Sequence, residues 1–498
     1  MAEATSITTT ASAELTEGGK LLEDILTGGN MIRSADQVQK QHAKDLIGEF
    51  VREVLAKDID KAKVNEDAVA SIQARIAEID RLIGEQLDEV LHNKSFQQLE
   101  ARWRGLHYLV MNTETGTSLK IRVLNIKQSE LAKDLESAAE FDRSNLFKKI
   151  YEEEYGTFGG APFGLLVGDY AFTGSNQDVG TLTKMSNVAA AAHAPFIASA
   201  SPELFDMQSF TSIGVPGDLA KLFEASTLIP YKEFRETEDS RYVALALPRV
   251  LLRVPYGPKG IPVEGFTYEE KVGENHDNFL WGNAAYALGQ RITNAFALYK
   301  WCAAIRGVEG GGLVENLPFY TFKTSEGDIA IKCPTEVAIT DRRENELSEL
   351  GFITLCYKKN SAQAAFFGGS TANKPKTYNL ASANANARLS AQLPYILASS
   401  RFAHYIKVMM RDKIGSFSTR EGIANYLNNW IADYVLLNDN AGQETKARLP
   451  LREARVDVTE VPGKPGAYRA VVFLKPHFQL NELSVSMRLV ADLPPPAG

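Results

Sequence analysis

The apolar residues of the chain follow different spacings, and the changes between them divide the sequence into regions. A helical period runs through residues 36–57 and 66–91, and a third helix is expected at about 95–113. From about 119 to 440, short apolar runs alternate with helical patterns, which is typical of an α/β layer. Near the C-terminus the period becomes two, as in β-strands. The sequence therefore predicts a mixed α/β (α+β) chain with an N-terminal helical region and C-terminal strands.

The first two helices each carry one apolar stripe. Such stripes need a partner surface, which is either the body of the protein or the helices of another chain. They consist of Leu46, Ile47, Phe50, Val51, Val54 and Leu55 in the first helix, and of Ile72, Ile76, Ile79, Leu82 and Ile83 in the second.

The middle of the chain predicts an alternating order of elements. Residues 205–278 are rich in Pro and Gly and are expected to be irregular. Strands are expected at 119–125, 163–172, 195–200, 335–340 and 352–358, and helices at 127–153 (two), 178–193, 280–305, 341–350 and 385–437, the last broken near Gly415.

The C-terminal strands are the clearest local signal. Apolar and polar residues alternate around 454–459 and 483–489, and in 468–475 Tyr468, Ala470, Val472 and Leu474 alternate with Arg469, Val471, Phe473 and Lys475. Gly and Pro turns such as 461–467 join the strands. Strands at a chain end expose backbone edges, so this tail either folds on its own body or receives strands from neighbours. The candidate intersubunit positions are Val456, Val458, Val472, Leu474, Val485 and Met487.

A short apolar stripe lies close to the N-terminus, between glycine pairs. A helix shorter than roughly 12 residues is unstable alone in water, so the stripe is a candidate partner-binding motif. Packing on its own domain is the alternative. The stripe consists of Leu21, Leu22, Ile25 and Leu26.

The densest charged segment is residues 340–352. Thr340 or Asp341 is expected to cap a helix there, with Glu344 as the partner three residues after Asp341. The pattern predicts that Leu347 and Leu350 face inward and that Arg342, Arg343, Glu346 and Glu349 are exposed. Such a surface is either a solvated helix face or an ionic docking site.

Composition narrows the functional classes. The net charge of −8 and the absence of a dense basic run disfavour a nucleic-acid binder. The three separated cysteines, Cys302, Cys333 and Cys356, are expected to be reduced and buried. The N-terminus has no secretory signal pattern, and no apolar run approaches the ~20 residues that span a bilayer. A soluble protein that stays in its compartment of synthesis is expected.

The sequence lacks the familiar motifs of catalysis. It contains no phosphate loop of the form GxxxxGK[ST], no HExxH zinc pair and no GxSxG elbow. The seven histidines are scattered, and no Cys–His cluster forms a metal site. We therefore expect no catalytic residue, no cofactor and no metal.

Five blocks resemble those of one family, in the family's order. LEARWRGLHYLV (99–110) is similar to its tryptophan-arginine-glycine signature. The others are YEEEYGTFGGAPFGLLVGDYAF (151–172), LPRVLLRVPYG (247–257), TDRRENELSELGF (340–352) and FAHYIKVMMRDKIGSF (402–417). The family is that of the large subunits of type VI secretion contractile sheaths (TssC/VipB), and the resemblance covers roughly residues 20–490.

The resemblance implies a structural role in the bacterial cytoplasm. It implies a core like that of phage tail sheaths, a small sheath subunit (TssB/VipA) as companion, and polymerisation with further copies around an Hcp tube on a baseplate. Contraction propels the tube, and the AAA+ unfoldase ClpV dismantles the sheath. The resemblance also implies that the Leu21–Leu26 stripe is the unfoldase motif and that terminal strands are exchanged between neighbours. Asp341, Glu344 and Glu346 are the candidate tube-facing residues.

The expected organisation has four parts, and two rival functions stay open. The parts are a tail (1–30), helices that pair with the small subunit (31–115), the sheath core (116–440) and the intersubunit strands (441–498). The rivals are an α/β enzyme without a known motif and an adaptor that binds one partner without polymerising.

Overall fold

A computed structural model of the chain describes residues 41–42, 45, 68–215, 217–273, 275–323, 329–416, 419–463, 466–477 and 479. The chain divides into two compact units, Met1–Ile83 and Gly84–Gly498. The described helices of eight or more residues are α3 (Ala68–Leu91), α4 (Lys94–Met111), α5 (Gln128–Ser137), α7 (Asn176–Ala192), α9 (Ile229–Glu236), α10 (Ala284–Tyr299), α11 (Asp341–Glu349), α12 (Ala381–Ser390), α13 (Leu393–Asp412) and α14 (Arg420–Ala432), together with a π-helical stretch, Lys148–Tyr155. Shorter helices are α6 (Asn145–Phe147), α8 (Leu219–Leu222) and α15 (Gln443–Arg448).

The second unit is built on a six-stranded mixed sheet with the strand order β1-β2-β3-β9-β10-β6. The first four strands in this order run parallel, and β10 is antiparallel to both β9 and β6. The strands are β1 (Leu166–Phe172), β2 (Phe196–Ala200), β3 (Val243–Leu247), β6 (Leu313–Val314), β9 (Phe352–Tyr357) and β10 (Ala364–Phe366).

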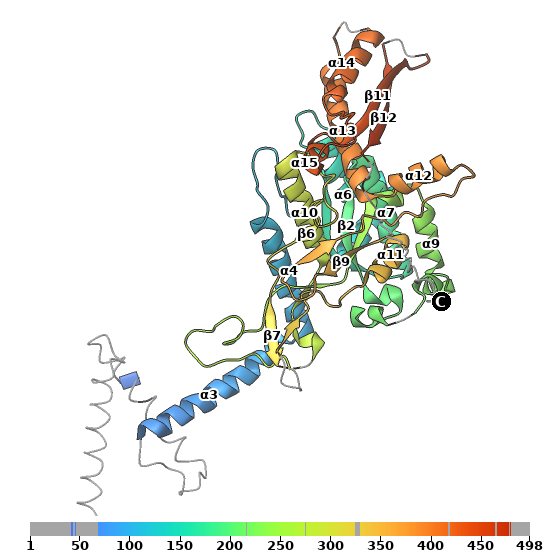
Figure 1. Ribbon diagram of the computed structural model, residues 1–498. Helices are drawn as coiled ribbons and strands as arrows, with labels where there is room; N and C mark the ends of the chain where they lie inside the picture. Colours follow the sequence, from blue (N-terminus) through green and yellow to red (C-terminus); the bar gives the residue numbers. More distant parts are fainter. Residues whose placement is uncertain are drawn as a thin grey trace, which may run out of the picture. The chain divides into compact units, whose positions relative to one another are not determined.

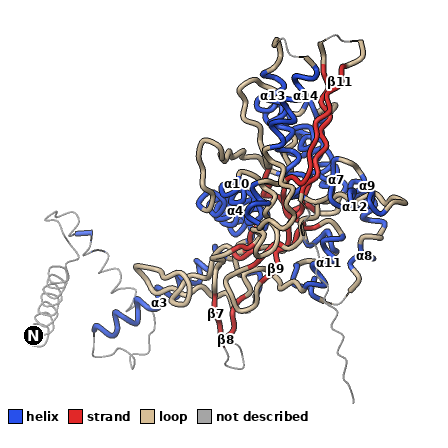
Figure 2. Tube along the Cα trace, turned by 45° about the horizontal axis from the view of Figure 1, so that its top comes forward, coloured by secondary structure: helices blue, strands red, loops and turns tan. Residues whose placement is uncertain are grey.

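Helices cover both faces of this sheet, as Figure 2 shows. Alternate residues of the buried strands enter different apolar clusters. Phe196 and Leu245 pack in the cluster that contains α7, whereas Ile197 and Ala244 pack in the cluster that contains α10. A parallel strand that is buried on both faces reads as a continuous apolar run rather than an alternation, which is the pattern of β2 and β3.

The C-terminal elements form a separate apolar cluster. The hairpin of β11 (Leu451–Glu460) and β12 (Tyr468–Pro476) lays Val456 and Val458 against α13 and α14, where Phe402 and Leu427 are buried (Figure 1). Trp301, next to the end of α10, stacks on Phe402 with ring centroids 4.2 Å apart. The hairpin therefore packs against the helices α13 and α14.

The second unit also contains two smaller two-stranded sheets. β4 pairs with β5 and β7 pairs with β8, both antiparallel. Their strands are β4 (Val250–Leu251), β5 (Trp281–Gly282), β7 (Tyr320–Lys323) and β8 (Ile329–Lys332).

Most of the predicted elements are present, and three predictions are wrong. The predicted strand at 119–125 has no regular secondary structure and no strand partner in the described residues. The predicted strand at 335–340 is reduced to a single bridge between Thr335 and Val250. The region 205–278 is not irregular throughout, since it contains α8, α9 and the central strand β3. In addition, the helical region 385–437 is interrupted between α12 and α13 as well as near Gly415.

Candidate functional site

The tryptophan-arginine-glycine signature, Trp103, Arg104 and Gly105, lies in α4, and its three residues differ in burial and in contacts. Gly105 is buried against the ring of Tyr286 in α10, and a Cβ there would lie 2.4 Å from a ring carbon. Only glycine permits this approach of the two helices. Trp103, by contrast, is 66% exposed, which is unusual for a side chain of this size.

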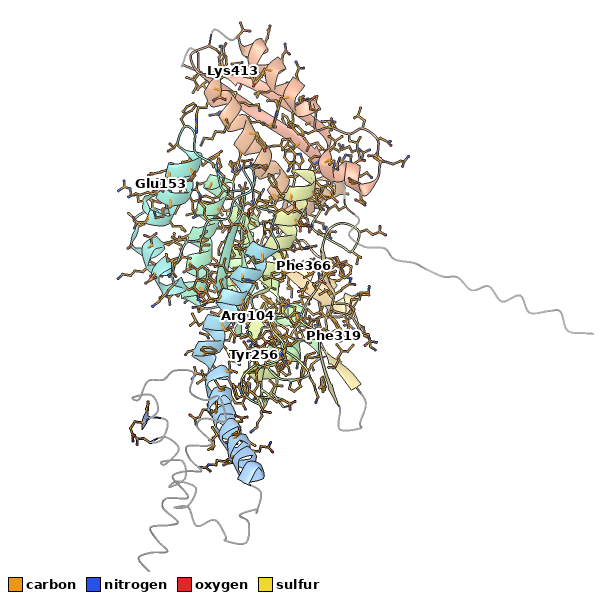
Figure 3. All side chains as sticks on the ribbon, turned by 90° about the vertical axis from the view of Figure 1, so that its left-hand side faces the viewer. Arg104, Glu153, Tyr256, Phe319, Phe366 and Lys413 are labelled. Atoms are coloured by element: carbon orange, nitrogen blue, oxygen red, sulfur yellow. The ribbon has the colours of Figure 1, made fainter. Side chains whose placement is uncertain are left out.

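Arg104, which is labelled beside Tyr256 in Figure 3, belongs to a network of ion pairs that fixes α4. Arg253 binds Glu270 at 2.6 Å and Glu100 of α4 at 2.8 Å, and the guanidinium lies 4.6 Å from the ring centre of Tyr256. Arg104 binds the same Glu100 at 2.7 Å and donates to the Tyr256 hydroxyl at 3.2 Å. Because Arg253 and Glu270 have almost no exposed side-chain surface, loss of one partner would strand the other charge in the interior.

Arg249, which lies like Arg253 in the block 247–257, also pairs with a buried carboxylate. Arg249 binds both carboxylate oxygens of Glu336 at 2.7 Å, and Ser209 donates to the same carboxylate at 2.7 Å. Burial raises the pKa of Glu336, but the hydrogen bonds and charge of Arg249 outweigh burial and hold that pKa below its ordinary value. The 247–257 block therefore supplies two charged anchors, one on each side of β4.

Two exposed apolar stripes lie on the helices that precede the sheet. Their side chains are between 37% and 66% exposed, as expected for helix faces that another chain covers. The stripes comprise Ile76, Ile79, Leu82 and Ile83 in α3, and Phe96, Leu99, Trp103 and Val110 in α4. The α4 stripe was missed in the sequence, although its spacing of three, four and seven residues is helical.

Helix α11 places its charges differently from the prediction. Leu347 is fully buried as expected, but Arg343 is buried rather than exposed, because it donates to the carbonyl of Val215 at 2.7 Å and to Glu346 at 2.6 Å. Glu344 is also buried, and burial raises its pKa. Of the candidate tube-facing residues, Asp341 is exposed, Glu346 is half-buried and paired, and Glu344 presents little surface.

The C-terminal hairpin has one edge that a side chain already occupies. Asn428 of α14 accepts from the Val456 amide at 2.9 Å and donates to the Val456 carbonyl at 2.8 Å. The polar backbone groups of Val456 therefore point away from β12, so the facing residue Val472 is in a non-hydrogen-bonded pair. It follows that Ala470, Val472 and Leu474 direct their own amides and carbonyls to the outer edge of β12.

Several predicted site residues fall outside the described part of the chain. These are the stripe of Leu21, Leu22, Ile25 and Leu26, the helix predicted at 36–57 and the third strand with Val485 and Met487. Within the described residues, no group of three or more His, Cys, Asp or Glu side chains is arranged to hold a metal ion. The same residues include no helix with the length and apolar character needed to cross a membrane.

The cysteines are reduced in this structure, and Cys356 is buried, whereas Cys302 and Cys333 are half-buried. Burial raises the pKa of both Cys302 and Cys356 to about 12. These thiols are therefore protonated at neutral pH and are poor nucleophiles.

Comparison with known proteins identifies the class. Residues 73–373 match the family described as EvpB/VC_A0108, tail sheath N-terminal domain, and residues 382–493 match the EvpB/VC_A0108 tail sheath gpW/gp25-like domain. The chain is 45% identical over 489 residues to the type VI secretion system sheath protein TssC1 of Pseudomonas aeruginosa, with 97% of this chain and 98% of that protein covered.

Two solved structures are similar over part of the chain. They are the baseplate of the anti-feeding prophage (TM-score 0.32, 11% identity) and its helical sheath in the contracted state (TM-score 0.30, 12% identity). Each covers 62% of this chain and 66% of the matched chain.

The two domain matches define a tail sheath protein. The chain belongs to the type VI secretion system sheath family, and it is a structural subunit of a tail sheath rather than an enzyme. This confirms the family and the structural role predicted from the five sequence blocks.

The ion network around Arg253 leads to a stability prediction. We expect Arg253→Met to lower the free energy of unfolding by about 3–5 kcal/mol, because the substitution leaves the buried carboxylate of Glu270 without its arginine partner, whereas Glu100 keeps Arg104. Urea denaturation followed by far-UV circular dichroism measures the change.

Lys259→Met is the matched control, because Lys259 and Glu269 lie 4.0 Å apart with both side chains more than 60% exposed. The control should change stability by less than about 1 kcal/mol. Equal effects of the two substitutions would show that burial of the Arg253 network does not matter.

Proposed function

We propose that this chain assembles with a small sheath subunit (TssB/VipA) and with further copies of itself into the cytoplasmic sheath of a type VI secretion system. In this proposal the sheath grows on a baseplate around an Hcp tube, and its contraction propels the tube. The observation that carries the proposal is the outer edge of β12, whose outward-facing backbone groups offer a strand-addition site between subunits.

The helix stripes suit the pairing with the small subunit. The apolar side chains of α3 and α4 are exposed at helical spacing, and Trp103 provides the large aromatic anchor that dominates many interfaces. A partner helix laid along such a stripe would bury this surface. We therefore assign residues 31–115 to the contact with the small subunit.

The β12 edge suits the contact between successive subunits. Backbone hydrogen bonds of an added strand are indifferent to most side chains, and they tolerate rotation of the joined bodies if a flexible connection flanks the strand. We assign the exchanged strands to residues 441–498, with Val456, Val458, Val472, Leu474, Val485 and Met487 as their apolar positions, and the sheath core to residues 116–440.

No nucleotide is needed for contraction in this scheme. A polymer stores work as the difference in free energy between two packings of the same chains. The unfoldase ClpV then acts after contraction, and we assign its recognition motif to the stripe in residues 1–30.

The assembly proposal is tested by co-expression with the small subunit and negative-stain electron microscopy. The wild-type pair should form long hollow tubes. Ala470→Pro removes an outward amide of β12 without removing a hydrogen bond to β11, so it should leave the heterodimer intact and shorten or abolish the tubes. Ala470→Ser, which keeps the amide, should assemble normally. Small uniform particles from the wild-type pair would refute the sheath function.

The unfoldase assignment leads to a binding prediction. Leu22→Asp with Ile25→Asp places two charges on the apolar stripe, which would have to be desolvated on binding. We expect at least a tenfold loss of ClpV affinity in fluorescence anisotropy, with normal tube formation. Undiminished affinity would move the recognition motif elsewhere.

The tube-facing assignment now depends on Asp341. Because Asp341 is exposed at the first turn of α11, Asp341→Lys should reduce the yield of Hcp-containing sheaths several-fold in pull-down assays. Asn345→Lys, also exposed on α11, adds the same positive charge without removing the acidic group. Equal yields for wild type and Asp341→Lys would count against a contact of Asp341 with the tube.

A further inference from the structure

Two of the five sequence blocks meet at a contact between the regions of the two domain matches. Tyr155 of the second block and His404 of the fifth block lie with their ring centroids 5.3 Å apart. Tyr155 belongs to the match over residues 73–373, and His404 belongs to the match over 382–493. The contact therefore links the region that carries the six-stranded sheet to α13, against which the C-terminal hairpin packs (Figure 1).

His404 is buried at this contact in its neutral form, with 2% of its surface exposed. Its Nε2 lies 2.9 Å from the carbonyl oxygen of Ala192, the last residue of α7. Because a carbonyl oxygen only accepts, Nε2 carries the proton and Nδ1 is the bare nitrogen. Nδ1 is buried without a hydrogen-bond partner among the described residues. A second proton could add only at Nδ1, where it would place an unpaired donor and a charge in the interior.

His193, which directly follows α7, takes part in the same contact. Its backbone is left-handed, with a φ of 50°, and its Nδ1 lies 3.2 Å from the Tyr242 hydroxyl. The centre of its ring is 6.2 Å from that of His404 and 5.9 Å from that of Tyr155. Two imidazoles at this separation would repel each other if both were charged.

The charged groups around the two histidines do not compensate added protons. Burial, together with nearby positive charge, lowers the pKa of His404 to about 4, although the hydrogen bond to Ala192 opposes this shift. Burial also lowers the pKa of His193. In the described part of the chain, neither histidine forms an ion pair with a carboxylate. The surrounding titratable groups are Arg401, Lys407 and Arg411 of α13, Tyr151 and Tyr155 of the π-helical stretch, and Asp239, Arg241 and Tyr242.

We propose that His193 and His404 form a pH-sensitive switch between α7 and α13. In mildly acidic solution both imidazoles take up protons, which releases the second half of α13 from α7 and lets the C-terminal hairpin move relative to the sheet. The direction follows from linkage, because the closed contact holds both histidines neutral and the open one exposes them to water. The contact is therefore stable above the ordinary histidine pKa of about 6.5 and weakens as the pH falls toward about 4.

Hydrogen–deuterium exchange on the full-length chain tests the switch, with wild type and the double variant His193→Asn/His404→Gln compared at the same pH. Asparagine tolerates the left-handed backbone, and glutamine keeps a donor for the Ala192 carbonyl, but neither side chain takes up a proton. For amides 404–411, the ratio of the wild-type exchange rate to that of the variant should rise at least tenfold between pH 7.5 and pH 5. The pKa values of about 6.5 and about 4 allow a rise of about thirtyfold from His404 alone.

His107→Gln is the matched control, because His107 is exposed on α4, and its exchange should follow that of the wild type at both pH values. Circular dichroism at pH 7.5 verifies that the variants are folded. If the double variant does not fold, His404→Gln alone, which leaves the left-handed residue unchanged, should still remove most of the pH dependence.

Two outcomes would overturn the switch. One is a ratio of exchange rates that stays constant between pH 7.5 and pH 5. The other is an equal rise at the amides of β2 and β3, which would show that the histidines act on unfolding of the whole unit and not on the contact between α7 and α13. Neither outcome depends on whether the chain forms tubes, so the sheath function is tested separately.

Discussion

Backbone polar groups at a strand edge need hydrogen-bond partners, and this constraint governs how the chain presents itself to others. On β11, the side chain of Asn428 supplies these partners for Val456, because it bonds both the amide and the carbonyl of that residue. Among the described residues, no side chain bonds the outer edge of β12 in this way. The register of the hairpin shows that the amides and carbonyls of Ala470, Val472 and Leu474 point to that edge. At β12 the fold therefore leaves backbone groups that an added strand could satisfy.

Buried charges give these surfaces their fixed positions. The arginines at 249 and 253 come from one short stretch, yet each reaches a carboxylate far away in sequence, at 336 and at 270. A buried pair of this kind adds little net stability, since desolvation offsets much of the attraction, but it strongly penalises wrong arrangements. The network around Glu100 thus sets the position of α4 on the body, and with it the direction in which the α4 stripe faces.

The sequence predicted the elements whose pattern depends on local periodicity. The hairpin alternation at 454–475 and the helix at 341–349 are where the pattern puts them. The central strand β3 was missed because VALAL is a continuous apolar run followed directly by Pro248 inside a Pro- and Gly-rich region, and such a run has no period to detect. The burial of Arg343 was missed because its partners, the carbonyls at 215 and 217, come from a distant loop. The segment 119–125 shows the reverse case, since its sequence favours a strand but it has no partner strand and no regular structure in the described residues.

The contact between Gly105 and Tyr286 is the point about which α4 would tilt if the two helices were pushed apart. Gly105 lies eleven positions after Lys94, where the helix begins, which corresponds to about 16 Å along the axis. A tilt of about 10° at the glycine would move the far end of α4 by about 3 Å. A bulky side chain at position 105 would therefore act at a distance, misdirecting the exposed face of α4 even if every residue on that face were unchanged.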